Sequence, residues 1–161
     1  VPVSTPFMPR ANKTIAKVSF SKVPIFGWVY KFGSVLVDRR SDQSRRKSYE
    51  EMKSILAVGL DMLIYPEGTR NRTGDPLKSF YDGAFRLAVD TKKRILPTIL
   101  FNSKNILPPN PSFCLMPGKI EMHFLPPVSV EGKTSKEVKE EVFELMWNYY
   151  AKNQQLLEGR I

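Results

Sequence analysis

The stretch Leu60-Asp61-Met62-Leu63-Ile64-Tyr65-Pro66-Glu67-Gly68-Thr69-Arg70 decides how the chain can fold. Residues 60–65 form a nearly continuous apolar run, which is typical of a buried central strand. Pro66 cannot donate to a strand ladder, and Gly68 permits a tight turn. The stretch therefore predicts a strand that ends abruptly in a loop of polar side chains.

Helix-like and strand-like segments alternate on both sides of this stretch. Ser41 or Asp42 can cap a helix whose apolar residues recur at helical spacing, and Gly59 is placed to end it. We expect strands at residues 14–18, 34–37, 60–65, 95–101 and 119–125, and helices at residues 41–58, 83–91 and 135–150, the last capped by Ser135. This order predicts an α/β fold with a single domain, in which helices flank a mixed, largely parallel sheet. The ligand site of such sheets lies beyond the carboxyl ends of the strands, and residues 66–70 follow one of those ends.

The composition restricts the partners and the metal chemistry. The 161 residues suffice for one domain with a core, and the formal net charge of +9 suggests an anionic partner: nucleic acid, an anionic membrane surface or a small phosphorylated substrate. A solvated basic surface explains the charge equally well. Cys114 is the only cysteine, so an internal disulfide and a cysteine-based metal site are excluded, and we expect Cys114 to be a small buried hydrophobic residue. No apolar run approaches the ~18 residues that span a bilayer.

The polar residues after the apolar run have the chemistry of an anion site. Arg70 offers a planar fork of donors that suits a phosphate. Glu67 can orient Arg70 or accept a hydrogen bond from a substrate hydroxyl, and Thr69 can donate or accept. The alternative interpretation is an ordinary turn between a strand and a loop that carries a surface ion pair. Glycine and proline are common in the loops of all proteins, so their presence here does not by itself indicate a site.

Several ordered blocks of the sequence carry a family resemblance. Tyr-Pro-Glu-Gly-Thr-Arg at residues 65–70 resembles the third conserved block of the glycerolipid acyltransferase family, of the 1-acyl-sn-glycerol-3-phosphate acyltransferase type. Further similarities keep the order and approximate spacing of that family: Lys17, Pro-Ile-Phe-Gly at 24–27 and Gly-Ser-Val-Leu-Val-Asp-Arg at 33–39 (second block), Phe-Tyr-Asp-Gly-Ala at 80–84 (after the third block), and Ile-Leu-Pro-Thr at 95–98 (fourth block).

The resemblance implies an activity and a set of site residues. The activity is transfer of a fatty acyl group from acyl-ACP or acyl-CoA to the free hydroxyl of lysophosphatidic acid, which forms phosphatidic acid for phospholipid biosynthesis. The implied acceptor-binding residues are Glu67, Gly68, Thr69 and Arg70 around the glycerol and phosphate, with Asp38, Arg39, Lys17 and Pro97. The resemblance implies no cofactor and no metal. It implies as partners a lysophospholipid acceptor, an acyl thioester donor that includes acyl carrier protein, and an anionic membrane surface on the cytoplasmic face, as at a bacterial inner membrane.

One part of the family pattern is missing. The family's first block, His-x-x-x-x-Asp, supplies the general base and the carboxylate that orients it. The sequence has one histidine, His123, and no aspartate follows it at the spacing of that block. We expect His123 to be a structural strand residue. The missing block would fall just before Val1, so we expect residues 1–161 to be an acyltransferase domain truncated at its N-terminus, with its catalytic residues upstream. A non-catalytic module that binds phospholipid or phosphate is the alternative.

Two segments near the start of the chain suggest contact with a lipid surface. The basic residues at 39–47 can contact anionic headgroups or form a solvated helix start. The aromatic residues at 24–32 suit a membrane interface or a core helix. No recognisable nucleic-acid motif accompanies the charge, so we expect no nucleic-acid partner.

Overall fold

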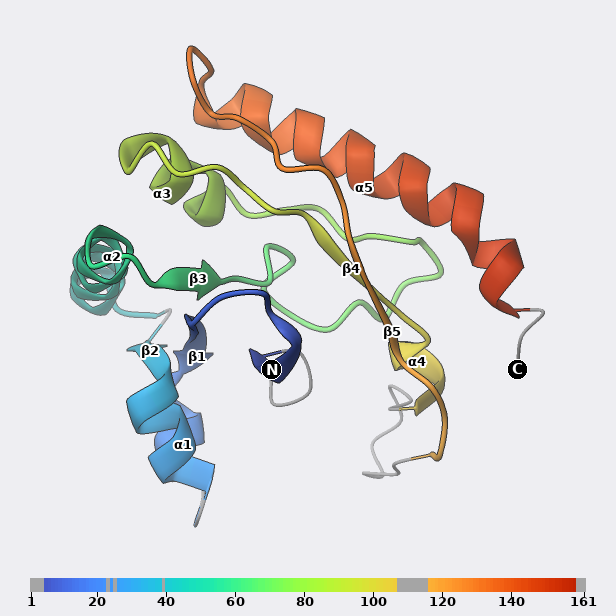
Figure 1. Cartoon of the computed structure of the whole chain (residues 1–161). Coiled ribbons are helices and arrows are strands. Elements are labelled where there is room, and N and C mark those ends of the chain that lie inside the picture. Colours follow the sequence, from blue (N-terminus) through green and yellow to red (C-terminus); the bar gives the residue numbers. More distant parts are fainter. Residues whose placement is uncertain (1–4, 23, 25, 39, 107–115, 159–161) are drawn as a thin grey trace. The chain divides into compact units, whose positions relative to one another are not determined.

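The computed structural model describes residues 5–22, 24, 26–38, 40–106 and 116–158, and Cys114 and Arg39 lie outside them. The chain forms two compact units, residues 1–65 (unit 1) and residues 66–161 (unit 2). Each unit combines strands with helices (Figure 1). The predicted α/β class is therefore confirmed.

Unit 1 contains a three-stranded parallel sheet. Its strands are β1 (Asn12–Lys17), β2 (Ser34–Val37) and β3 (Asp61–Leu63), in the order β2-β1-β3. A 2.7 Å hydrogen bond between the buried Thr14 and Ser34 hydroxyl groups ties β1 to β2. The prediction that residues 60–65 form the buried central strand is wrong for this sheet, because β3 is an edge strand, only half-buried, and β1 lies at the centre. Its apolar sequence did not reveal its partners, since strand pairing depends on distant parts of the chain.

The long helix of unit 1 has the ends that the sequence predicts. Helix α2 (Asp42–Ala57) begins at the N-cap Ser41, whose hydroxyl accepts a hydrogen bond from the amide of Ser44. Gly59 follows the helix with a φ of 87°, a left-handed conformation that glycine adopts without strain. Helix α2 packs against β2 and β3 through its buried face, which includes Met52 and Leu56.

A short helix with exposed aromatic residues precedes β2. The chain passes from η1 (Thr5–Phe7) through β1 and η2 (Val18–Lys22) into α1 (Phe26–Gly33). Gly27 is buried where α1 crosses η2, and an added Cβ there would lie 2.3 Å from the carbonyl oxygen of Ser21. The outer side chains Trp28 and Phe32 are 73% and 66% exposed, so the expectation of a core helix is wrong for this face.

Unit 2 is built around an antiparallel strand pair and a long helix. Strands β4 (Thr98–Phe101) and β5 (Glu121–Phe124) pair antiparallel, which fits the mixed strand directions that we expected, but they form a sheet of their own and not part of one sheet. The four-residue helix α4 (Ser103–Ile106) follows β4. Helices α3 (Gly83–Asp90) and α5 (Ser135–Glu158) pack together over the core (Figure 1). The core includes Phe80, Phe85, Phe101, Leu125, Val138 and Val142.

Helix α5 starts with a capping box one residue earlier than the sequence indicated. The hydroxyl and amide of Thr134 both donate to the Glu137 carboxylate, at 2.8 and 2.7 Å, and the Thr134 hydroxyl accepts from the Glu137 amide at 3.3 Å. Thr134, not Ser135, is therefore the cap. The helix continues to Glu158, eight residues past the predicted end. Across the described ranges, no helix combines the length and the apolar character needed to cross a membrane.

Candidate functional site

The loop that follows β3 begins with a fixed turn. The carbonyl oxygen of Pro66 accepts a hydrogen bond from the amide of Tyr81 at 2.9 Å, which holds the start of the loop to the segment before α3. Gly68 has a φ of 69°, so the loop turns through a left-handed residue at its centre. These two features set the backbone on which Glu67, Thr69 and Arg70 are displayed.

Glu67 has a half-buried carboxylate that is only partly satisfied. The backbone amide of Lys78 donates to it, and the ammonium groups of Lys104 and Lys78 lie near enough to stabilise its charge. Burial nevertheless raises the pKa of Glu67 above its usual value, because desolvation outweighs these contacts. Its Oε2 atom is buried and has no hydrogen-bond partner among the residues that the structure describes. The carboxylate therefore has an acceptor position available for a ligand hydroxyl.

Thr69 and Arg70 present polar groups to solvent on the same loop. Both side chains are exposed, and the ammonium of Lys78 donates to the Thr69 hydroxyl at 3.2 Å. Within the described ranges, no hydrogen bond or ion pair engages the guanidinium of Arg70. Glu67 does not pair with Arg70, so the surface ion pair of the alternative interpretation is absent there. Arg70 keeps its full set of donors for an anion.

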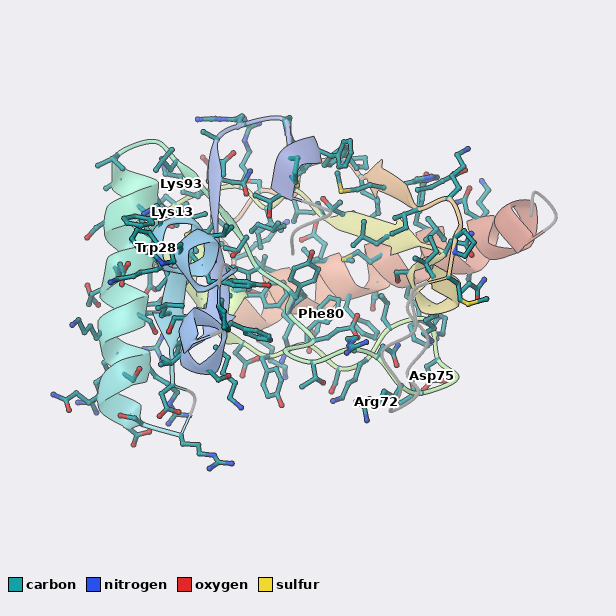
Figure 2. The ribbon with its side chains drawn as sticks, turned by 90° about the horizontal axis from the view of Figure 1, so that it is seen from below. Lys13, Trp28, Arg72, Asp75, Phe80 and Lys93 are labelled. Atoms are coloured by element: carbon teal, nitrogen blue, oxygen red, sulfur yellow. The ribbon has the colours of Figure 1, made fainter. Side chains whose placement is uncertain are left out.

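The rest of the loop, residues 71–75, is closed by its own hydrogen bonds. The Asn71 side chain accepts from the amide and hydroxyl of Thr73, at 2.9 and 2.7 Å, and donates to the carbonyl of Asp75 at 2.9 Å. Figure 2 labels Arg72 and Asp75 on this loop. The ammonium of Lys104, from α4, donates to the Thr73 carbonyl at 3.0 Å and fastens the loop to the end of β4.

The structure places Pro97 in the interior of unit 2. Its ring is buried, and its carbonyl accepts a hydrogen bond from the amide of Leu125 at 2.9 Å. Pro97 thus fixes the entry into β4 beside β5. A role in shaping the pocket wall stays a prediction.

Two of the predicted site residues of unit 1, Lys17 and Asp38, lie at neighbouring strand ends at one edge of its sheet. Lys17 is the last residue of β1, and its register partner in β2 is Val37, immediately before Asp38. Lys17 is exposed and forms no ion pair with any described residue. Asp38 shapes the turn into α2, since its carboxylate accepts from the amide of Arg40 at 3.0 Å. Among the described residues, the carboxyl ends of β1 and β2 therefore carry a lysine without an ion pair, Lys17, and a turn-forming carboxylate, Asp38.

Comparison with known proteins identifies the family of the chain. Residues 3–100 match the family model described as Acyltransferase. The chain belongs to the acyltransferase family. That match spans the parallel strands of unit 1, the loop at 66–70 and β4 up to residue 100.

Relatives of this acyltransferase chain come from several kingdoms. It is 30% identical over 112 residues to "1-acyl-sn-glycerol-3-phosphate acyltransferase CHLREDRAFT_174358" of Chlamydomonas reinhardtii, covering 69% of this chain and 33% of that protein. It is 30% identical over 145 residues to 1-acyl-sn-glycerol-3-phosphate acyltransferase of Haemophilus influenzae, covering 87% of this chain and 57% of that protein. The crystal structure of the 1-acyl-sn-glycerophosphate (LPA) acyltransferase PlsC from Thermotoga maritima is similar at a TM-score of 0.71 and 25% identity, covering 89% of this chain and 57% of that one. The chain therefore spans between a third and somewhat over half of the length of these relatives.

Two lysines that contact the loop were missed by sequence reasoning. Lys78 touches both Glu67 and Thr69, and Lys104 reaches the same loop from α4. The glycine and proline at positions 74 and 76 indicate that the chain turns back. That signal could have placed Lys78 beside the motif, but nothing local to residue 104 indicates its contact.

His123 lies in a strand and makes packing contacts, in keeping with the structural role that its strand-like sequence predicts; that role stays a prediction. It lies on β5, with its Nδ1 atom 2.9 Å from the Tyr149 hydroxyl and its Nε2 atom 3.2 Å from the Glu121 carboxylate. Its ring packs edge-on against Phe101 at a centroid distance of 4.9 Å. Lys119 and His123 together lower the pKa of the Glu121 carboxylate through their hydrogen bonds. The contacts with Tyr149 and Phe101 hold β5 to α5 and β4.

Proposed function

We propose that this chain is part of an enzyme that transfers a fatty acyl group from acyl-ACP or acyl-CoA to the free hydroxyl of lysophosphatidic acid, forming phosphatidic acid. One observation carries the proposal: a chain of the acyltransferase family displays an unpaired Arg70 and a half-buried Glu67 with a free acceptor atom on one loop. The acceptor has a phosphate and a glycerol hydroxyl, which match these two groups.

Different residues of the loop would recognise different groups of the acceptor. Arg70 would hold the phosphate through a charge-assisted, bidentate contact, and the Oε2 atom of Glu67 would accept from the glycerol hydroxyl. Thr69 adds a hydroxyl beside them. The family resemblance assigns four further residues to acceptor binding, in which Lys17 and Arg39 would contribute positive charge beside Asp38 and Pro97.

The transfer itself is a single displacement at a thioester. The acceptor oxygen attacks the carbonyl carbon, a C–O ester bond forms, the C–S bond breaks, and the thiol leaves with the proton that the hydroxyl gave up to a base. The family resemblance assigns that base to a His-x-x-x-x-Asp block, which residues 1–161 do not contain. We assign this chain the acceptor-binding half of the reaction. We further propose that the reaction needs no metal or cofactor, and that a chelator leaves its rate unchanged.

Replacement of Arg70 tests the assignment in the full-length protein. Loss of a hydrogen bond to a charged group costs about 1.5–3 kcal/mol, so Arg70→Ala should lower kcat/KM for lysophosphatidic acid about 10- to 100-fold. Arg94→Ala, which removes an exposed arginine elsewhere on unit 2, is the matched control. Assays with acyl-ACP, acyl-CoA and a panel of lysophospholipids identify the donor and the acceptor. Unchanged kinetics of Arg70→Ala would contradict the role of the loop.

A non-catalytic module that binds phospholipid or phosphate is the second candidate. The observation that favours it is the structural use of His123, the only histidine of the sequence. The two candidates differ in one result. The module binds lysophosphatidic acid without turning over either thioester donor, whereas the enzyme releases free thiol in step with phosphatidic acid.

We also propose that unit 1 contacts an anionic membrane surface, on the cytoplasmic face of the membrane. The supporting feature is an exposed aromatic pair on α1, Trp28 and Phe32, whose ring centroids lie 6.2 Å apart; Phe20 and Val29 of unit 1 are also exposed. Lys31, between Trp28 and Phe32 in the sequence, is exposed and would reach lipid phosphates.

Vesicle sedimentation tests this contact. Each aromatic ring buried in lipid is worth about 1.5–3 kcal/mol, so the double replacement of Trp28 and Phe32 by serine should weaken binding to anionic vesicles at least ~10-fold. Tyr81→Ser, which changes an aromatic residue that is exposed on unit 2, is the control. Equal partition of the double variant and the wild type would rule out a role of this pair.

A further inference from the structure

We propose that Lys78 is a further specificity-determining residue, which forms with Arg70 a two-cation site for the phosphate of the acceptor. The inference rests on the proposed function for the identity of the acceptor. It adds a residue outside the motif at 65–70 and commits the site to a dianionic phosphomonoester.

Lys78 is attached to the loop at two points. Its backbone amide donates to the Glu67 carboxylate, and its ammonium lies 3.2 Å from the Thr69 hydroxyl oxygen. Lys78 therefore contacts both ends of the turn at residues 67–69, the Glu67 carboxylate and the Thr69 hydroxyl. This double attachment fixes the direction of a side chain that would otherwise be free to rotate.

The ammonium of Lys78 has capacity left for a ligand. An ammonium carries three donors, and the contact with Thr69 uses one of them. In the part of the chain that the structure describes, no carboxylate lies within ion-pair distance of it. The side chain is half-buried, so solvent screens its charge less than that of a fully exposed lysine.

The charge of the ligand explains why one arginine is insufficient. A phosphomonoester carries about −1.5 to −2 charges at neutral pH, and Arg70 supplies one positive charge. The ionised Glu67 on the same loop repels the phosphate. Lys78 offsets that repulsion next to Thr69, while Lys104 donates to the Thr73 carbonyl and holds the loop in place.

The test asks whether the positive charge of the side chain at position 78, and not only its hydrogen bond to Thr69, is needed to bind the phosphate. It uses variants of the full-length protein. Lys78→Gln removes the charge and keeps a donor for Thr69, whereas Lys78→Arg keeps both. Lys93→Gln is the matched control, because Lys93 (labelled in Figure 2) is exposed on unit 2 and its side chain forms no ion pair with a described residue. Three readouts are needed: KM and kcat for lysophosphatidic acid, binding of glycerol 3-phosphate by calorimetry, and the thermal unfolding midpoint.

We expect Lys78→Gln to weaken glycerol 3-phosphate binding, and to raise KM for lysophosphatidic acid, by about tenfold or more. Its kcat and unfolding midpoint should stay near those of the wild type, Lys78→Arg should recover most of the affinity, and Lys93→Gln should match the wild type. The inference is overturned if Lys78→Gln binds glycerol 3-phosphate normally. It is also overturned if the loss comes with a lower unfolding midpoint that arginine does not restore, or if the wild type does not bind glycerol 3-phosphate.

The experiment separates this inference from the proposed function. If the full-length protein transfers no acyl group but its binding of glycerol 3-phosphate falls in Lys78→Gln, the transfer activity is wrong and the two-cation site stands. If transfer occurs and is sensitive to Arg70→Ala but not to Lys78→Gln, only the two-cation site is wrong.

Discussion

Replacement of His123 decides whether the single histidine of this chain has a structural or a catalytic role. His123→Ala removes a 2.9 Å contact with the Tyr149 hydroxyl, a 3.2 Å contact with Glu121 and an edge-on contact with the Phe101 ring. Each hydrogen bond is worth about 0.5–1.5 kcal/mol and the aromatic contact about the same. Because the His123 side chain is 26% exposed, we expect the low end of the sum, about 2 kcal/mol.

Thermal unfolding and steady-state kinetics of the full-length protein measure the two possible effects separately. A loss of about 2 kcal/mol lowers the unfolding midpoint of a domain of this size by roughly 4–8 °C. The kcat per folded molecule should stay within about twofold of the wild type, because the contacts of His123 among the described residues are with Glu121 of β5, Phe101 of β4 and Tyr149 of α5, which all lie outside the loop at 66–70. Tyr149→Phe, which removes one of the hydrogen bonds, should lower the midpoint by about half as much.

The opposite pattern would refute this reasoning. General base catalysis contributes about 10²- to 10⁴-fold, so a catalytic histidine would lose at least ~100-fold in kcat. Such a loss with an unchanged unfolding midpoint would make His123 the base. It would also remove the reason to expect a separate His-x-x-x-x-Asp block.

Two further predictions concern stability. Thr134→Ala removes the capping box of α5 and should lower the free energy of unfolding by about 1 kcal/mol, which corresponds to an unfolding midpoint about 2–4 °C lower. Ser135→Ala, the control, should have little effect. Equal effects at the two positions would show that Thr134 is not the cap. Burial raises the pKa of Glu67, so the folded state favours its protonated form, and its ionisation opposes folding as the pH rises through the folded pKa. At pH 7, Glu67→Gln should therefore unfold at or above the midpoint of the wild type. The difference between the two midpoints should shrink as the pH falls towards 4.5, the ordinary pKa of a glutamate. A midpoint of Glu67→Gln several degrees below that of the wild type at pH 7 would contradict this prediction.

The helices were predictable because their signals are local. Ser41 caps α2, Gly59 follows it in a left-handed conformation, and α3 begins at Gly83, all as the sequence indicates. The cap of α5 was misplaced by one residue, since Thr134 and Ser135 are both good capping residues and only the carboxylate of Glu137 distinguishes them. Local chemistry thus locates a helix well and its first residue less well.

The strand pairing was less predictable because it depends on distant segments. The apolar run at 60–65 indicates a strand, yet its position at the edge of the sheet follows from β1 occupying the centre. The antiparallel pairing of β4 with β5 joins segments about twenty residues apart, and the periodicity of each segment does not encode the direction of its partner. Similarly, the aromatic residues of α1 suited a core and an interface equally, and only the packing of Gly27 on η2 shows which face is turned outwards.

The candidate site shows the same division between local and long-range information. The motif at residues 65–70 contains one carboxylate and one guanidinium, Glu67 and Arg70, so by itself it has no net charge. The positive charge that a phosphate requires is added by Lys78 and Lys104, which reach the motif only through the folded path of the loop and of α4. A motif with the same residues but without such lysines would still form the turn, yet it would bind a dianion more weakly. We infer that the sequence motif specifies where the acceptor binds, whereas residues outside the motif set how strongly its phosphate is held.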